Sequence, residues 1–260
     1  MLASIDGVLM DAANATISVL DEGLLRGDGV FEVIRVYAGR PFAPDEHLDR
    51  MARSAASLRL PLDVVAIRGD VDALLTEGGP NDAALRLVAT RGGRRIALLE
   101  PLKVFPETIA LATITYSPTR LLDGVKSLSY GANMLATRLA KEAGAEEALL
   151  VSPHGRVLEG PVTSFFYVLG GELCTPPLSD RILDSISRRI LLEVTDARER
   201  VTTIDDLPSI SEAFLASSLR EVMAVRSIDG REIDTAPGPV ANAAAQLVRE
   251  HIEASLRPPA

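Results

Sequence analysis

Apolar and polar positions along the chain follow two periods, the two-residue alternation of strands and the longer repeat of helices. Residues 30–37 are β-branched and aromatic, which predicts a buried strand. Residues 45–58 carry apolar side chains at helical spacing after Pro44-Asp45, a common helix start, which predicts a helix. Because the two patterns are interspersed along the chain, we expect an α/β fold with mixed sheets.

The same patterns assign elements to most of the remaining chain. A hairpin is expected from residues 4–9 and 16–20. Further strands are expected at 85–90, 108–115, 147–152, 164–169, 172–175, 212–218 and 222–228, and further helices at 64–75, 132–142, 185–195 and 241–254. Residues 116–124 have the Pro, Gly and Asp content of a connecting segment. We therefore predict a small N-terminal domain at 1–115, an interdomain connection at 116–124 and a larger C-terminal domain at 125–260.

Composition excludes several classes of function. A formal net charge of −9 argues against nucleic acid as a partner, since phosphate binding needs a concentrated basic face. Cys174 is the single cysteine, which fits a reducing compartment, and no apolar stretch approaches the roughly 20 residues that span a bilayer. The three histidines are too scattered for a zinc signature, so no metal is expected. A cytoplasmic protein that binds neither membrane nor nucleic acid is expected.

Two ionisable residues have contexts that suit covalent chemistry. Lys126, one of only three lysines, lies between a glycine turn and a predicted helix start among apolar neighbours. Partial burial would favour the neutral amine that attacks an aldehyde, although a lysine reaching from the surface to water is the ordinary alternative. Glu159 follows Val157-Leu158 in a tight turn, where its carboxylate could pair with a protonated pyridine nitrogen or simply face water.

Other residues have the chemistry of anion binding. Ser185, Ile186 and Ser187 open a predicted helix, where backbone N–H groups favour a phosphate, although N-capping alone would explain the serine. Ser217 and Ser218 could add hydroxyl groups. Arg50 could add a charge-assisted contact from the inward side of its helix, or form a surface ion pair. Arg94 and Arg95, in the basic turn at 91–95, could hold an anionic substrate group or lie exposed.

The order of these segments resembles one family. Gly27-Asp-Gly-Val-Phe-Glu32, His47-Leu-Asp-Arg50, Lys126-Ser-Leu-Ser-Tyr-Gly-Ala-Asn-Met134, Leu158-Glu-Gly160 and Ile182-Leu-Asp-Ser-Ile-Ser-Arg188 are similar to the motifs of class IV (fold type IV) pyridoxal-phosphate enzymes. That family includes branched-chain aminotransferases, D-amino acid aminotransferases and aminodeoxychorismate lyases. The resemblance runs from about Ser4 to Ile228. It implies pyridoxal 5′-phosphate (PLP) as the cofactor, two domains with the cofactor at their interface, and a homodimer.

The resemblance also implies roles for single residues. Lys126 would be the Schiff-base lysine and move the proton, and Glu159 would pair with the pyridine nitrogen. The residues implied for the phosphate are Arg50, Ile186, Ser187 and Ser218, with Ser217 beside them. Thr163 would line the cofactor, although the family's usual Glu-Gly-x-x-Ser-Asn is here Glu159-Gly-Pro-Val-Thr-Ser164, without the asparagine.

The substrate is a small amino acid paired with a 2-keto acid in the favoured interpretation. Phe31 stands where D-amino acid aminotransferases usually have tyrosine and branched-chain enzymes have phenylalanine, whereas residues 27–37 otherwise resemble the D-amino acid enzymes. We expect Phe31, Arg94, Arg95 and Tyr130 to contact the substrate, which is a branched-chain L-amino acid or a D-amino acid.

Two alternatives stay open at this stage. The stretches 126–134 and 157–161 resemble proteins labelled aminodeoxychorismate lyases, which expel pyruvate to give 4-aminobenzoate. Val33, however, stands where those lyases usually have threonine. The second alternative is a non-catalytic family member, and the presence of both Lys126 and Glu159 argues against it.

Overall fold

The computed structural model describes residues 1–117 and 119–257, and it divides into two compact units. The first unit comprises Met1–Val104, Val125–Tyr130 and, of the described residues at the C-terminal end, 255–257. The second comprises Phe105–Gly124 and Gly131–Ala254. The predicted connection at 116–124 includes Pro118, which lies outside the described residues. The domain boundaries at 115 and 125 stay a prediction.

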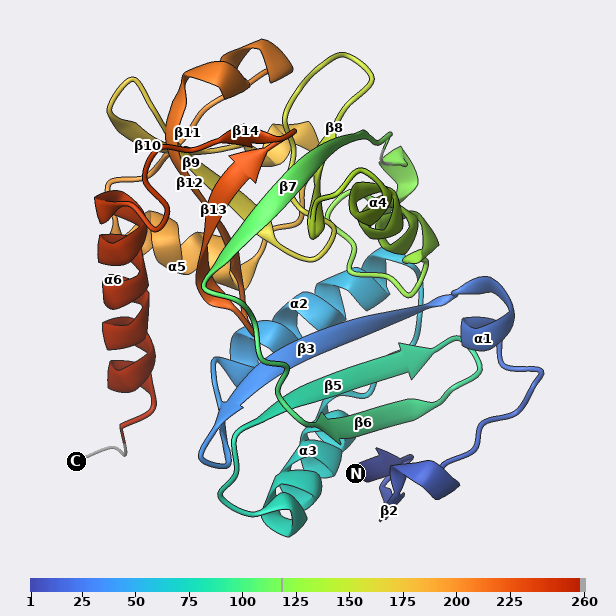
Figure 1. Cartoon of the computed structure of the whole chain (residues 1–260). Coiled ribbons are helices and arrows are strands. Elements are labelled where there is room, and N and C mark those ends of the chain that lie inside the picture. Colours follow the sequence, from blue (N-terminus) through green and yellow to red (C-terminus); the bar gives the residue numbers. More distant parts are fainter. Residues whose placement is uncertain (118, 258–260) are drawn as a thin grey trace. The chain divides into compact units, whose positions relative to one another are not determined.

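The first unit is built on a six-stranded antiparallel sheet with the strand order β2-β1-β6-β5-β3-β4 (Figure 1). Its strands are β1 (Leu2–Ile5), β2 (Val8–Asp11), β3 (Gly29–Tyr37), β4 (Arg40–Pro41), β5 (Ala83–Thr90) and β6 (Arg95–Glu100). Its helices are α1 (Glu22–Arg26), α2 (Pro44–Ser57) and α3 (Val64–Gly78). The buried apolar residues of α2 and α3 form one core with β3, β5 and β6.

Strand β3 shows why the core forms on this face of the sheet. Alternate side chains of a strand point to opposite faces. Val30, Ile34 and Val36 are almost fully buried and join Leu48 and Met51 of α2 in the core. Helix α2 begins with Pro44 at its first turn, followed by two acidic residues that complement the positive end of the helix dipole.

The second unit contains an eight-stranded mixed sheet with the order β11-β10-β9-β12-β13-β7-β8, and β14 pairs with β13. Its strands are β7 (Thr108–Thr115), β8 (Glu147–Val151), β9 (Ser164–Leu169), β10 (Glu172–Thr175), β11 (Arg198–Glu199), β12 (Ile210–Ser217), β13 (Glu221–Ile228) and β14 (Arg231–Glu232). Strands β8, β7 and β13 run parallel, and β9, β12 and β13 pair antiparallel.

Three helices belong to the second unit, namely α4 (Gly131–Glu142), α5 (Ile186–Val194) and α6 (Pro239–Ser255). Small residues of α4 and of strands β7 and β8 allow a close approach, since Ala136 and Ala140 pack with Ala110, Ala112 and Ala148. Helix α5 packs near β12. No helix in the described part of the chain is both long enough and apolar enough to cross a bilayer.

The predicted hairpin of residues 4–9 with 16–20 is wrong. Strand β1 pairs with β2, which starts at Val8, and residues 16–20 contain no strand. The reason is the Asp6-Gly7 turn, in which both residues have positive φ angles of 53° and 90°. An Asp-Gly pair of this kind closes a two-residue hairpin directly. Helix α1, strand β6 and the two-residue strands β4, β11 and β14 were not predicted.

Candidate active site

Lys126 belongs to the first unit, where its backbone is fixed by β3 and α2. The Lys126 N–H donates to Ser54 Oγ at 3.1 Å, and the Phe31 N–H donates to the Lys126 carbonyl oxygen at 3.1 Å. Ser127 forms an antiparallel bridge with Val30, and the Leu128 N–H donates to the Gly29 oxygen at 2.9 Å. The segment Val125–Tyr130 therefore runs antiparallel along the start of β3, with one isolated bridge between Ser127 and Val30.

Two aromatic rings surround the amine of Lys126. Its Nζ lies 4.4 Å from the Phe31 ring centroid and 5.8 Å from the Tyr130 ring centroid. The two rings meet edge to face, with centroids 5.1 Å apart. Ring faces attract a cation, and two rings of fixed geometry limit where the amine can move. The structure thus brings together the predicted residues Lys126, Phe31 and Tyr130.

Arg50 lies on the buried face of α2, together with His47 and Ser54. Its Nε and Nη2 atoms donate to the two carboxylate oxygens of Glu32, each at 2.7 Å. His47 Nδ1 lies 2.7 Å from Glu32 Oε2. Glu32 and His47 are fully buried, and Arg50 is 5% exposed. The predicted phosphate ligand is thus held in a two-pronged ion pair inside the first unit.

The charges of this cluster follow from its burial and its hydrogen bonds. Burial would raise the pKa of Glu32, but the hydrogen bonds from Arg50 and His47 outweigh it and lower the pKa to about 2. Burial lowers the pKa of His47, with Arg50 and Lys126 acting in the same direction and Glu32 opposing them. Since the carboxylate can only accept, neutral His47 donates from Nδ1. The cluster therefore pairs one anion with one guanidinium cation.

Glu159 belongs to the second unit and follows strand β8 by a tight turn. Its carbonyl oxygen accepts from the Leu150 N–H at 2.9 Å, and its Oε1 accepts from the Leu183 N–H at 3.0 Å. Burial, together with the negative charge of Glu159, raises the pKa of Tyr116. The carboxylate is thus held by the segment that leads into α5 and has a phenol among its neighbours.

The start of α5 has the features expected of an anion site. Ser185 is the N-cap, and its Oγ accepts from the Arg188 N–H at 3.4 Å. The first N–H groups of a helix have no acceptor within the helix, and the helix dipole favours an anion there. Ile186 is buried and Ser187 is half-buried, and both belong to the first turn because α5 begins at Ile186.

The other predicted residues of the second unit lie at one end of its sheet. Ser164 of β9 pairs with Ala216 of β12, which puts Thr163 and Ser217 at the same end of the two strands. Ser217 Oγ accepts from the Arg220 N–H at 3.3 Å within the turn that joins β12 to β13, and Ser218 in that turn is half-buried. Thr163 Oγ1 donates to Glu147 Oε1 at 3.0 Å.

The two predicted substrate arginines form ion pairs within the first unit. Arg94 pairs with Asp6, and Arg95 Nε lies 3.1 Å from Asp70 Oδ2. Asp6 also accepts from the Arg95 N–H at 2.8 Å, which ties the β5–β6 turn to the β1–β2 turn. These pairs give both arginines a structural role, and their contact with substrate stays a prediction.

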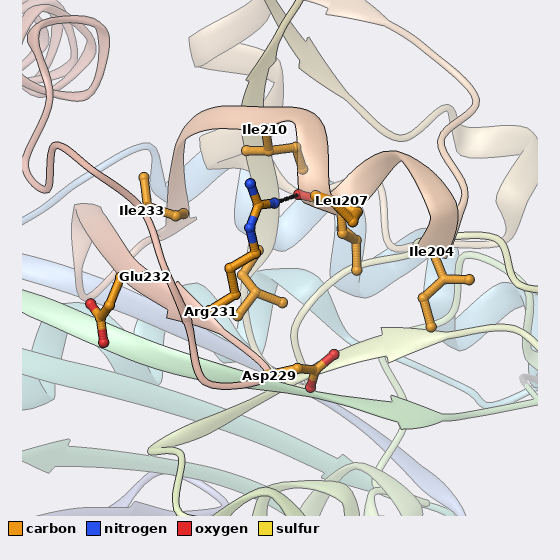
Figure 2. A pocket seen from close by; sticks show the side chains of 9 residues that line it. Ile204, Leu207, Ile210, Asp229, Arg231, Glu232 and Ile233 are labelled. Carbon is orange, nitrogen blue, oxygen red and sulfur yellow. Dashed lines mark hydrogen bonds between the residues drawn. The ribbon is translucent and has the colours of Figure 1, made fainter.

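A pocket of about 250 Å³ lies in the second unit (Figure 2). Ile210 at the start of β12 and Ile228 at the end of β13 line it, opposite to the turn that carries Ser217 and Ser218. Arg231 crosses the pocket and donates to the Leu207 oxygen at 3.3 Å. Within residues 1–117 and 119–257, no group of three or more His, Cys, Asp or Glu residues could hold a metal ion.

Several residues around the candidate site were not singled out from the sequence. Glu32 and His47 lie within the motifs at 27–32 and 47–50, but the motifs do not show that Glu32 binds both His47 and Arg50. Ser54 follows His47 and Arg50 at helical spacing, so an amphipathic view of α2 could have found it. Glu147 showed no local signal, because its partners are 16 and 73 residues away in sequence.

The family of the chain follows from a match over most of its length. Residues 29–228 match the model of the amino-transferase class IV family. The chain therefore belongs to the class IV aminotransferases. The predictions of this family, of an enzyme and of PLP as its cofactor are confirmed.

Individual relatives support the same class. The chain is 35% identical over 256 residues to a protein provisionally named as a branched-chain-amino-acid aminotransferase from Methanocaldococcus jannaschii, with 88% of each chain covered. It is 30% identical over 259 residues to a D-alanine aminotransferase from Bacillus licheniformis, covering 90% of this chain and 91% of the relative.

A solved structure confirms the fold. An aminotransferase from Mycobacterium tuberculosis, described as hypothetical, superimposes in its PLP-bound form with a TM-score of 0.89 and 26% identity, covering 98% of this chain and 99% of that one. A form with α-ketoglutarate and PMP bound gives a TM-score of 0.88 at the same identity, covering 97% and 99%. The predicted mixed α/β architecture of fold type IV is confirmed, and these relatives favour amino transfer over the lyase alternative.

Proposed function

We propose that this PLP-dependent aminotransferase moves the amino group of a branched-chain L-amino acid or a D-amino acid to a 2-keto acid, with Lys126 as the catalytic residue. The observation that carries this proposal is the position of Lys126 Nζ, 4.4 Å from the Phe31 ring centroid on a backbone held by Ser54. PLP, when bound to that amine, supplies the electron sink that makes the substrate's α-proton removable.

The described residues fit this cofactor by their chemistry. The N–H groups and hydroxyls at the start of α5 suit a phosphate, and Arg50 carries a permanent positive charge. The carboxylate of Glu159 suits a protonated ring nitrogen. We assign Arg50, Ile186, Ser187, Ser217 and Ser218 to the phosphate, Glu159 to the ring nitrogen and Thr163 to the cofactor wall.

Lys126 has two tasks in this assignment. Its Nζ would hold the cofactor, and the same amine would accept the proton from the substrate Cα. The aromatic rings of Phe31 and Tyr130 lie beside this amine and limit where it can move. We assign Phe31, Tyr130, Arg94 and Arg95 to substrate binding.

The choice of substrate rests on two similarities. Phe31 resembles the branched-chain enzymes, and the chain is similar both to a relative named for branched-chain amino acids and to one named for D-alanine. Both donor classes are therefore part of the proposal. Family resemblance further supports a homodimer, and the single cysteine supports a cytoplasmic location. Sedimentation of the purified protein tests the dimer.

The test is an absorbance titration of the PLP-loaded protein with L-leucine and with D-alanine. One of the two donors alone should remove the absorbance of the lysine-bound cofactor, and a 2-keto acid should restore it. Lys126→Ala should abolish this cycle. Lys141→Ala, at an exposed position on α4, is the matched control and should leave it unchanged. A loaded wild-type protein that responds to no amino acid of either hand would refute the proposal.

A further inference from the structure

Glu147 is a buried carboxylate that the proposed assignment leaves unused. It is the first residue of β8, paired in register with Leu111 of β7, and it is only 3% exposed. A carboxylate removed from water is costly unless hydrogen bonds and an opposite charge compensate it. The partners that compensate Glu147 therefore indicate what it does.

The two oxygens of Glu147 reach two different turns of the second unit. Oε1 accepts from Thr163 Oγ1 at 3.0 Å, and Oε2 forms an ion pair with Arg220, whose side chain is 13% exposed. Thr163 ends the turn that begins at Glu159, and Arg220 lies in the turn that follows Ser217 and Ser218. One carboxylate thus connects the turn assigned to the ring nitrogen with the turn assigned to the phosphate.

The contact with the first turn is close. The Gly160 N–H donates to the Thr163 carbonyl oxygen at 2.8 Å, which closes the turn. A Cβ atom on Gly160 would lie 2.1 Å from Thr163 Oγ1 and 3.0 Å from Glu147 Oε1, so there is no room for a side chain there. Glu147 and Thr163 therefore pack directly against the residue that follows Glu159, and they fix the direction in which the chain leaves Glu159.

The contact with the second turn involves the backbone as well as the charge. The Arg220 N–H donates to Ser217 Oγ, and the Arg220 guanidinium carbon lies 4.9 Å from the Phe105 ring centroid. Glu221, which begins β13, has a φ angle of 57°, as residues after a short hairpin loop often do. The ion pair of Arg220 with Glu147 thus anchors the end of the short loop that carries Ser218.

We propose that Glu147 is a positioning residue for cofactor binding: its carboxylate fixes the Glu159–Thr163 turn relative to the Ser217–Arg220 turn. This inference rests on the proposed function, because it takes Glu159 and the serines as the groups that hold the ring and the phosphate. Groups that orient a binding residue raise affinity by fixing that residue before the ligand arrives. Loss of the Glu147 carboxylate should therefore lower the affinity for PLP by more than the accompanying loss of apoprotein stability explains.

The experiment compares Glu147→Gln with Glu146→Gln. Glutamine keeps the shape of Glu147 and an acceptor for Thr163, but it removes the charge that pairs with Arg220. Glu146 is the matched control, because it also pairs with an arginine, Arg226, and accepts from the Ala110 N–H, yet it is exposed and contacts neither turn. The dissociation constant of PLP, the ³¹P NMR signal of the bound phosphate and the unfolding of the apoprotein in urea are measured for each.

In Glu147→Gln the dissociation constant of PLP should rise about tenfold, as is common when a group that orients a ligand residue is lost. Its ³¹P signal should shift or broaden, because the phosphate turn has become mobile. Glu146→Gln should match the wild type in both measurements. Equal PLP affinity in the two variants would overturn the inference, and so would a loss of affinity that only mirrors a loss of stability.

Thr163 provides a second, smaller perturbation in case Glu147→Gln does not fold. Thr163→Val removes the hydroxyl that donates to Glu147 and keeps the shape, whereas Thr163→Ser keeps the hydroxyl. The valine variant should bind PLP more weakly than the serine variant, because only the serine variant keeps the hydrogen bond to Glu147. Equal affinity in both would contradict the inference. If the wild-type protein itself shows no donor-driven spectral cycle, the proposed function fails, independently of how the variants bind PLP.

Discussion

Replacing Glu32 with glutamine tests the buried cluster that holds Arg50. The carboxylate of Glu32 accepts three hydrogen bonds of 2.7 Å, two from Arg50 and one from His47, and it is fully buried. Glutamine keeps the size of the side chain but cannot balance the charge of Arg50. An arginine left buried without its anion destabilises a fold strongly.

The size of the effect follows from the pKa of Glu32. The fold lowers that pKa from 4.5 to about 2, and each unit corresponds to roughly 1.4 kcal/mol. The ionised carboxylate therefore stabilises the fold by about 3 kcal/mol at pH 7. Because the pKa is lower in the folded protein, this contribution is complete above pH 4.5 and is lost as the pH falls towards 2. At pH 3.5 it should be about 2 kcal/mol.

His47 adds a pH dependence of the same sign. Its pKa is lowered by burial, so the unfolded chain takes up the proton first, near the ordinary value of 6.5. Stability should therefore begin to fall as the pH drops below 6.5, before Glu32 contributes. The wild-type apoprotein should lose stability through both steps.

The assay is urea unfolding of the apoprotein at pH 7 and pH 3.5, so that cofactor binding does not alter the free energies. Glu100→Gln is the matched control, because Glu100 binds Arg86 through the same two-pronged geometry, at 2.9 Å twice, but is 28% exposed. Glu100→Gln should lower the free energy of unfolding by less than about 1 kcal/mol. The reasoning is wrong if Glu32→Gln costs no more than this control, or if its cost does not shrink in acid.

Three further predictions concern other parts of the fold. Gly69→Ala should raise the free energy of unfolding by about 1 kcal/mol, because Gly69 lies inside α3 and an added Cβ would have nothing within 4 Å. Thermal denaturation measures this gain, and its absence would contradict the prediction. Glu212→Gln should lower the free energy of unfolding by about 1 kcal/mol, because Glu212 Oε2 accepts from the N–H groups of Val240 and Ala241 at the start of α6. Hydrogen exchange should show faster exchange of the amides in the first turn of α6. Burial raises the pKa of Tyr167 to about 12, so the free energy of unfolding should fall above pH 10, where the phenol ionises in the unfolded chain. Tyr167→Phe should remove the step near pH 12 from the ultraviolet titration of tyrosine.

Long periodic segments were the most predictable part of the fold. The bounds of β7, β9 and β10 agree with the prediction to the residue, whereas α4 differs by one residue at its start and α2 and α5 differ by one residue at each end. These segments bury one face or both, so packing selects the same residues that the pattern displays. Short elements whose bounds depend on turn chemistry were not found. Strand β2 depends on the Asp6-Gly7 turn, and α1 depends on capping by Asp21, whose carboxylate accepts from the Gly23 N–H.

The structure places two arginines of the basic turn, Arg94 and Arg95, in ion pairs that the sequence did not predict. The sequence presented Arg94 and Arg95 as a basic turn open to an anion, yet each has a carboxylate partner 25 residues or more away in sequence. No local sequence pattern distinguishes an unpaired arginine from one whose carboxylate partner is distant in sequence and is brought close by folding. The sheet brings the partners together here, because β1 and β6 are neighbours and place Asp6 beside Arg95, while contact of either arginine with substrate stays a prediction.

The cluster around Glu32 could have been predicted from two periods combined. In strand β3 a two-residue period puts Glu32 on the same face as Val30, Ile34 and Val36, a face that is otherwise entirely apolar. A carboxylate in such a position requires a buried cation. In α2 a helical period puts His47 and Arg50 on the face of Leu48 and Met51, so the helix that covers β3 supplies that cation. Polar residues that interrupt two facing apolar patterns therefore predict each other, and the same comparison applied to other charged residues on buried faces would identify such pairs before a structure is known.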